Sequence, residues 1–187
     1  MKRAISVAFC LLILLGTVSC GKEELQSDKY IGEGLLVTFK VMVDCNQEFY
    51  NDIFVLGHLD VDKEKQFEKD GITWAPVVSE KYKTYDDLLS AMRSVYTEDC
   101  VQAILKKYDF YADVDGVLCF NTAFADKVES GKKWVRTDDW TPEVEEKGEA
   151  YYQVEYKFYA GKSDEIDEFR FDKTTNGYRL TELQRVD

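Results

Sequence analysis

Histidine and proline are the residues this chain has least of: His58 is the only histidine, and Pro76 and Pro142 are the only prolines. The sequence also lacks a G-x-S-x-G motif, a P-loop and an H-E-x-x-H pair. Together these absences exclude the common catalytic triads and histidine-rich metal sites. We therefore predict a protein that is not an enzyme and holds no cofactor. Without a proline-rich linker or an internal repeat, one domain is the simplest organisation.

Basic residues are scarce as well, with 24 Lys and Arg against 36 Asp and Glu, a net charge of −12. Such a charge is unfavourable for binding nucleic acid or anionic lipid head groups. The content of 45% hydrophobic and 14% aromatic residues is typical of a folded chain. We predict an acidic, folded protein that does not bind nucleic acid.

The five cysteines include no C-x-x-C pair. Cys10 and Cys20 belong to the N-terminal segment, so Cys45, Cys100 and Cys119 remain for the folded part. Three cysteines allow at most one disulfide, with three possible pairings, and export would permit one. We favour buried apolar thiols.

The N-terminal residues have the layout of an export signal, in which the basic Met1–Arg3 precedes an uncharged, leucine-rich segment. This segment ends in Leu15-Gly16-Thr17-Val18-Ser19-Cys20, which resembles the bacterial lipobox, with Thr17 where leucine is preferred. We predict a signal peptide over 1–19 and a lipid thioether on Cys20. A plain secretory signal and an uncleaved membrane helix are the alternatives.

Removal of the signal peptide would change the net charge of the protein, and lipid attachment would determine its location. Residues 1–19 carry Lys2 and Arg3 and no acid, so 24 − 2 = 22 bases face 36 acids and the net charge becomes 22 − 36 = −14. Residues 20–33 would be the lipidated cysteine and a polar tether, and 34–187 a single domain long enough to bury a core. We expect this domain to lie outside the cytoplasm, anchored to the cell membrane by Cys20.

The spacing of apolar residues predicts helices in the first half. A long amphipathic helix is expected over about 33–56, although Val37, Val41 and Val43 leave a strand as the alternative for its first part. Thr84 and Thr97 are expected to cap two short helices that follow one another.

Hairpins are predicted around three turns. Asp70-Gly71 leads into a strand over Ile72–Val78, which we place at a sheet edge because Pro76 cannot donate a hydrogen bond. The other predicted strands are Tyr108–Val114 and Val117–Asn121 around Asp115-Gly116, Lys133–Thr137, Tyr151–Tyr159 with Asp167–Asp172, and Tyr178–Leu183 after Asn176-Gly177. The fold class is α+β, with N-terminal helices packed on a curved antiparallel sheet.

The acidic runs are interpreted as solvated loops. Asp60–Glu64 begins like a calcium-binding loop, but Lys65 stands where that loop needs glycine. Asp113–Gly116 is explained by a hairpin turn, and the acids of Glu143–Glu149 and Asp164–Glu168 are expected to face solvent. We predict no metal site.

Tyrosine and tryptophan are abundant, and they suit core edges and recognition surfaces equally. The functional interpretation is an aromatic groove ringed by acids, suited to a basic or polar partner. Lys132–Gly148 is the least regular segment and the first place to look for recognition. The candidate partner-binding residues are Trp134, Trp140, Tyr111 and Asp113.

Several segments resemble the IseA-type family, which comprises exported bacterial proteins, typically of Firmicutes, that inhibit cell-wall DL-endopeptidases. The segments are Trp74–Val78, Tyr82–Leu88, Val95–Asp99, Phe110–Leu118 and Thr175–Leu180. The last is also similar to the final strand pair of NTF2-like (cystatin-like) domains. The resemblance covers about Leu35 to the C-terminus and implies an NTF2-like fold and an inhibitory role.

These observations lead to one main hypothesis and two alternatives. We expect a lipid-anchored binding module whose acidic surface blocks the basic cleft of a cell-wall hydrolase. The alternatives are an NTF2-like pocket that binds a small ligand, with or without a weakly defined activity, and an envelope scaffold protein. A filled sheet concavity would favour the binding module, and a deep closed cavity with an acid at its floor would favour the pocket.

Cys20→Ser is expected to abolish lipid attachment, because a serine cannot form the thioether. Metabolic labelling of the producing bacterium with an alkyne fatty acid should label the wild type and a Cys10→Ser control, but not Cys20→Ser. Equal labelling of all three proteins would contradict the assignment of Cys20.

Overall fold

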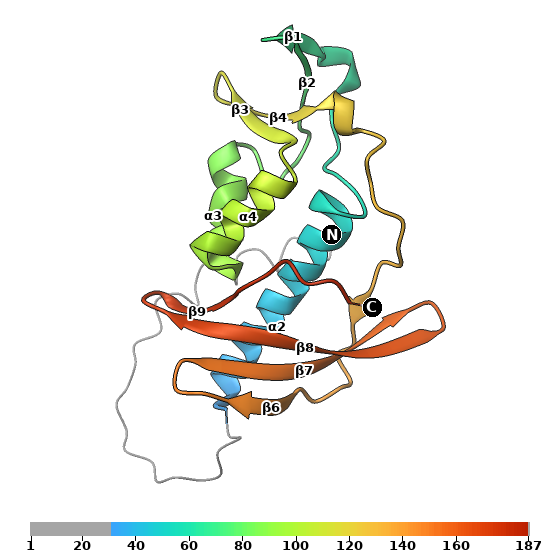
Figure 1. Ribbon diagram of the computed structural model, residues 1–187. Coiled ribbons are helices and arrows are strands. Elements are labelled where there is room, and N and C mark those ends of the chain that lie inside the picture. The colour runs from blue at the N-terminus through green and yellow to red at the C-terminus, as the bar shows by residue number, and fades with distance from the viewer. Residues whose placement is uncertain (1–30, 187) are drawn as a thin grey trace.

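The computed structural model describes residues 31–186 of the chain. Within these residues, three α-helices and two antiparallel sheets confirm the predicted α+β class (Figure 1). The predicted signal peptide, Cys20 and most of the tether lie outside the described residues. Within 31–186, no helix combines the length and the apolar character that crossing a bilayer requires.

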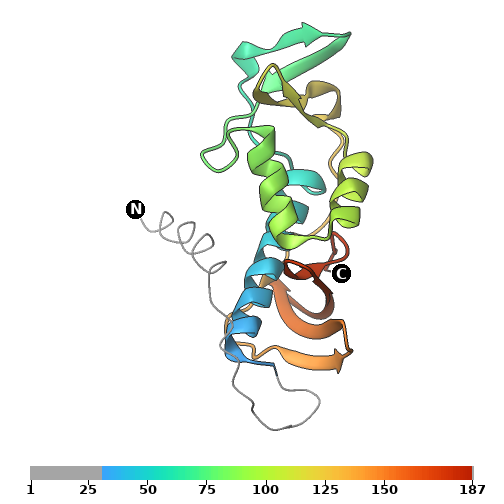
Figure 2. The ribbon, with the colours of Figure 1, turned by 90° about the vertical axis from the view of Figure 1, so that its left-hand side faces the viewer.

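Helix α2 (Glu33–Glu48) runs between the two sheets, which lie at opposite ends of the molecule (Figure 2). It continues into the π-helical segment η2 (Phe49–Phe54), so the predicted long helix is confirmed and the strand alternative is wrong. Its apolar residues recur every three or four positions, which is the helical period, and its face against the core buries Phe39, Met42, Val43, Phe49 and Ile53.

The lower sheet has the strand order β5-β7-β8-β9, and β6 also pairs with β7. Its long strands are β7 and β8, and alternate residues of β7 are buried against α2. Phe39 of α2 stacks on Phe171 of β8 with ring centroids 3.9 Å apart. The strands are β5 (Val135–Arg136), β6 (Glu143–Lys147), β7 (Tyr151–Ala160), β8 (Ser163–Thr174) and β9 (Gly177–Leu180).

Two of the acidic runs lie on strands of this sheet, so their interpretation as loops is wrong. Glu143–Lys147 forms β6, and Asp164–Glu168 belongs to β8. A strand needs an apolar face only where it meets the core, and its other face tolerates charge. Both acidic segments form strands because they make hydrogen bonds with β7. Their amino-acid composition alone would indicate a loop.

The upper sheet has the order β1-β2-β4-β3, so β2 lies inside the sheet and its predicted edge position is wrong. Pro76 pairs with Cys119 of β4, and its carbonyl accepts a hydrogen bond from the Asp62 N–H at 2.9 Å. Pairing with β1 stops at Trp74, so β1 needs no donor from Pro76. The strands are β1 (Phe67–Lys69), β2 (Ile72–Pro76), β3 (Tyr111–Val114) and β4 (Val117–Asn121).

Both Asp-Gly hairpin turns are confirmed. Asp70 and Gly71 have φ of 54° and 77°, and Asp115 and Gly116 have φ of 57° and 84°. Two consecutive positive φ angles are what the two-residue turns of twisted hairpins require, and Asp and Gly adopt them with little strain.

The two predicted caps begin helices α3 (Tyr85–Val95) and α4 (Glu98–Lys107). Thr84 and Asp87 form a capping box, in which the Thr84 hydroxyl accepts from the Asp87 N–H and the Asp87 carboxylate accepts from the Thr84 N–H. Hydrogen bonds from Thr84 lower the pKa of Asp87. Thr97 accepts from the Cys100 N–H in the same way.

The prediction of buried thiols is confirmed for Cys100 and Cys119, whereas Cys45 is only half-buried. Cys45, Cys100 and Cys119 form no disulfide with one another, and Cys100 and Cys119 are buried. Burial raises the pKa of Cys100 to about 12, so its thiol stays protonated at neutral pH. Cys100 is therefore a packing residue, and we expect no reactive thiolate there.

A fully buried amide, Asn46, joins three parts of the fold. Its Oδ1 accepts from the Tyr96 hydroxyl at 2.9 Å and from the Gln184 N–H at 3.0 Å. Its Nδ2 donates to the Gln184 carbonyl at 2.8 Å. Helix α2 is thereby linked to the end of α3 and to the C-terminal segment.

Asn46→Ala is expected to lower the free energy of unfolding by about 2–4 kcal/mol, because it leaves the buried Tyr96 hydroxyl and the half-buried Gln184 backbone groups without these partners. Urea denaturation followed by circular dichroism measures this. Asn176→Ala, in the exposed turn before β9, is the matched control and should change stability by less than about 0.5 kcal/mol. Equal effects of the two substitutions would contradict the assigned role of Asn46.

Candidate functional site

Two of the four predicted site residues are buried. Trp134 has 6% of its surface exposed and packs into the core. Tyr111 has 4% exposed, and its hydroxyl accepts from the Leu59 N–H and donates to the Ile53 carbonyl. Burial raises the pKa of Tyr111 well above its usual range. Both side chains have structural partners and are not presented at the surface.

The other two predicted residues lie at different ends of the molecule, Asp113 on the upper sheet and Trp140 in a loop next to the lower sheet. Asp113 is exposed in the β3–β4 hairpin, where its carboxylate accepts from the Gly116 N–H at 2.7 Å. Trp140 lies beside the lower sheet, and its buried Nε1 has no hydrogen-bond partner among the described residues. The structure therefore does not bring the four residues together into one site.

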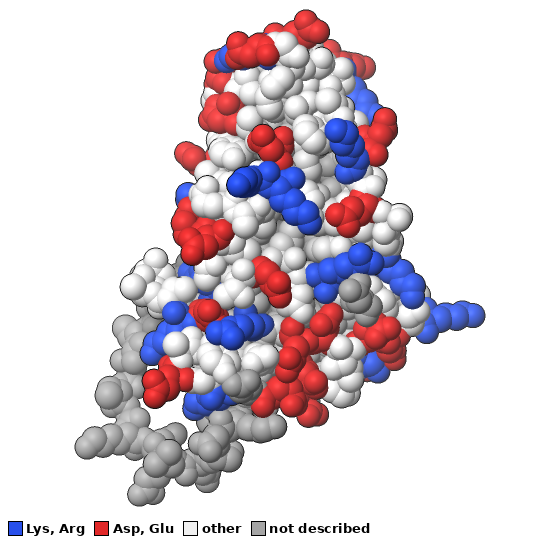
Figure 3. Space-filling model, in the orientation of Figure 1, with Lys and Arg blue, Asp and Glu red and all other residues white. Residues whose placement is uncertain are grey.

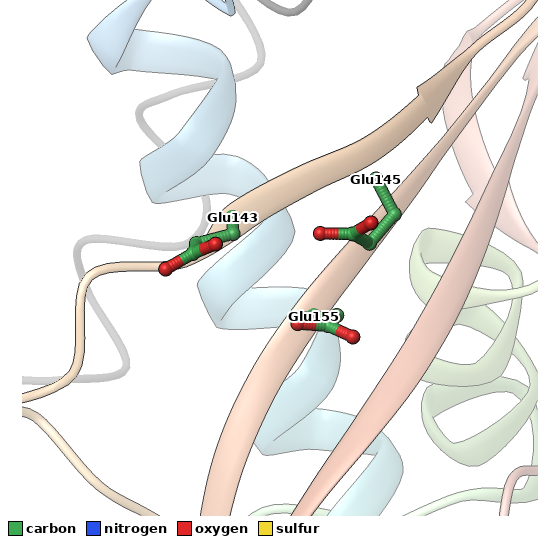
Figure 4. A group of neighbouring side chains, drawn as sticks. All are labelled: Glu143, Glu145 and Glu155. Carbon is green, nitrogen blue, oxygen red and sulfur yellow. The ribbon is translucent and has the colours of Figure 1, made fainter.

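The side of the lower sheet that faces away from α2 presents three glutamates to solvent. Carboxylate oxygens of Glu143, Glu145 and Glu155 lie within 4.8 Å of one another (Figure 4). Glu155 stands opposite Glu143 on β6 and opposite Glu168 on β8. We call these four residues the acidic cluster. It forms part of the acidic surface over the lower sheet (Figure 3).

The pairing of β6 with β7 assembles the acidic cluster, and β6 carries a bulge next to it. The register between β6 and β7 shifts between Val144 and Glu146, so an extra residue, Glu145, enters β6 at this point. Glu143 and Glu145 are two residues apart, so the alternation of a strand points both side chains to the same face, and the register places Glu143 opposite Glu155. Acids at 143, 145 and 155 are visible in the sequence, but the strand pairing that juxtaposes them is not.

The chemistry of the acidic cluster suits cations. Carboxylate oxygens are ligands for Ca²⁺, Mg²⁺ and Mn²⁺, and they also accept hydrogen bonds from lysine and arginine. Glu143, Glu145 and Glu155 are the side chains that could hold a metal ion among the described residues. No second feature of the site distinguishes a metal ion from a protein cation, so the prediction that the protein holds no metal stays a prediction.

The residues next to the acidic cluster on the same face are held by hydrogen bonds and by a cation–π contact. Gln153 donates to Glu168 at 3.1 Å. Arg170 lies over the Tyr151 ring, 4.2 Å from its centroid, and donates to Asp172 at 2.7 Å. Apolar side chains are exposed at the far end of the face, where Val135, Tyr159 and Ile166 are each about half exposed. The face thus combines an acidic centre with an apolar end.

The opposite side of the sheet holds the strands to helix α2. Arg136 is 8% exposed and donates to both carboxylate oxygens of Asp44, at 2.7 and 2.9 Å. It also donates to Asp138 at 3.0 Å, and hydrogen bonds to these carboxylates raise its pKa. This paired, nearly buried cation fixes the edge of the sheet on which the candidate site is built.

Comparison with known proteins adds no relative: no family model matches the chain, and no curated protein matches it either. The likeness to the IseA-type family therefore stays a prediction from the residues quoted for it.

Glu143→Gln is expected to stabilise the protein by about 0.3–1 kcal/mol at low ionic strength, because it removes repulsion between like charges on facing strands. Urea denaturation in low and high salt measures this, and the gain should shrink in salt. The matched control is Glu149→Gln, an exposed residue after β6, which should change stability less. Destabilisation by Glu143→Gln would show that the acidic cluster is not under electrostatic strain.

Proposed function

We propose that this protein is a lipid-anchored, extracytoplasmic binding module that docks a basic segment of a protein partner on its acidic cluster. It acts without catalysis, and Cys20 holds it at the cell membrane. The sharper version, implied by the resemblance to the IseA-type family, is inhibition of a peptidoglycan DL-endopeptidase by covering its active-site cleft.

The observation that carries the proposal is that side chains fill the space between the lower sheet and helix α2. Phe39 and Phe171 stack there, and Tyr152, Tyr156 and Phe158 of β7 are buried on the same side. Side chains of α2 thus occupy the space in which a ligand-binding sheet would keep a pocket. This supports recognition on the outer face and speaks against a small-ligand pocket inside the sheet.

Electrostatics supports a basic partner. The outer face carries the acidic cluster at its centre, and the net charge of the chain is −12. Charge complementarity mainly accelerates encounter and selects partners of opposite sign. A lysine or arginine seated among Glu143, Glu145 and Glu155 would also relieve the repulsion between them. The exposed Tyr159 and Ile166 would add apolar contact at the end of the face.

The membrane anchor supports an envelope target. A tether confines the module to a thin layer outside the membrane and so raises its effective concentration near the wall. A modest affinity for a hydrolase that works in this layer is then sufficient for inhibition.

The test is inhibition of peptidoglycan hydrolysis by the purified lipoprotein in a mild detergent, with DL-endopeptidases of the producing bacterium. The wild type should reduce the rate, and the triple variant Glu143→Gln, Glu145→Gln, Glu155→Gln should need at least ten-fold more protein. Inhibition should weaken as salt is raised.

The matched control removes three acids elsewhere: Glu64→Gln, Glu80→Gln and Asp126→Asn, all at exposed positions. It makes the net charge less negative by the same three units and should inhibit within two-fold of the wild type. Undiminished hydrolysis at saturating wild-type protein would overturn the inhibitor version. If both triple variants weaken inhibition alike, general charge acts and the acidic cluster does not.

A further inference from the structure

The edge of the lower sheet is interrupted by a loop that a regular strand would not need. Before it, the Thr137 N–H donates to the Lys157 carbonyl at 2.9 Å, and after it Glu143 pairs with Glu155. Between these two points the edge has five residues, Asp138–Pro142, whereas the neighbouring strand β7 has only one, Tyr156. We call these five residues the edge loop.

The edge loop is held from the sheet and from the helix. Asp138 accepts from Arg136, whose guanidinium is also bound by Asp44 of α2. Trp140 is half-buried with its Nε1 enclosed, and Pro142 is buried. A loop anchored in this way makes a defined wall, as ligand sites require.

An open surface hollow of about 520 Å³, which we call the cleft, lies between the edge loop and the β7–β8 hairpin. Its volume is within the range of small-molecule sites. Val135 and Tyr159 stand opposite each other on β5 and β7, and 49% and 45% of their surfaces are exposed. They give the cleft an apolar platform, and polar side chains surround it, among them Asp139, Lys157, Lys162 and Asp164.

The charges of the lining cancel. Asp138, Asp139 and Asp164 balance Arg136, Lys157 and Lys162, so 3 − 3 = 0. Two of the opposite pairs are already formed, since Lys157 contacts Asp164 at 2.9 Å and Arg136 contacts Asp138 at 3.0 Å. At these four side chains a charged ligand would have to break an ion pair before it could gain its own, and the two remaining charges, Asp139 and Lys162, are of opposite sign.

A neutral ligand rich in hydroxyl groups meets no such obstacle. Each hydroxyl can donate to a carboxylate and accept from an ammonium group that remains in its ion pair. The exposed face of a tyrosine ring is suited to the C–H face of a sugar ring, which is apolar although its rim is polar. Sugars are the ligands that combine both properties.

We propose that this cleft binds a neutral oligosaccharide, with Tyr159 as the platform and with Asp139, Lys157 and Asp164 bonded to its hydroxyl groups. The site is separate from the acidic cluster, and its occupancy does not depend on a protein partner.

Calorimetric titration of the full lipoprotein, in a detergent without sugar head groups, tests the proposal with maltotriose and N-acetylchitotriose as probes. At least one trisaccharide should bind saturably, with one site per chain. Tyr159→Ala should weaken binding at least ten-fold. Tyr151→Ala is the matched control, because it lies on the same strand and the same face outside the cleft, and it should change affinity less than two-fold.

A second variant, Asp139→Asn, should weaken binding about five-fold without removing the platform. Absence of saturable binding by both trisaccharides up to about 10 mM would overturn the proposal, as would equal losses from Tyr159→Ala and Tyr151→Ala. Tyr159-dependent binding of a Lys-Glu dipeptide, with no binding of either sugar, would assign the cleft to a zwitterion and also overturn it. The triple glutamine variant of the acidic cluster should bind sugar normally, which keeps this test independent of the proposed inhibition.

Discussion

The hydrogen bonds of Asn46 are the constraint on which the rest of the structure depends. A completely buried amide is tolerated only where its donors and acceptors are satisfied, and here three bonds to Tyr96 and Gln184 do so. They set the position of α2 relative to the α3–α4 pair and the C-terminal segment. Because α2 is held there, Phe39 meets Phe171 and the lower sheet packs against the helix.

This packing decides where function can lie. Aromatic rings fill the side of the sheet that faces α2, so recognition is left to the outer face and its edges. On that face the sheet juxtaposes Glu143, Glu145 and Glu155, an arrangement that repels itself and favours a cation. At the edge, the Arg136–Asp44 pair holds a loop that walls a cleft of different chemistry, apolar at its platform and neutral in its charge. One rigid scaffold thus offers two distinct surfaces.

Local signals were sufficient for much of the fold. Thr84 and Thr97 begin helices because their hydroxyls satisfy free N–H groups, and the Asp-Gly pairs turn because those residues accept positive φ. Each of these choices depends on a few neighbouring residues. Predictions failed where partners distant in sequence decide. Glu143–Lys147 is a strand because β7 pairs with it, and Pro76 is tolerated inside a sheet because the pairing of β2 with β1 stops at Trp74, so β1 needs no N–H from Pro76.

The sequence by itself determined the helices, the hairpin turns, the α+β class and the acidic character, since caps, turns and apolar periodicity are local and charge is additive. Only the tertiary structure decided which aromatic and acidic residues are available. The predicted candidates Trp134 and Tyr111 are buried, whereas Tyr159, which is not among those candidates, is about half exposed. The acidic cluster likewise arises from the register between β6, β7 and β8. Burial and juxtaposition depend on contacts between distant segments, and no local pattern encodes them.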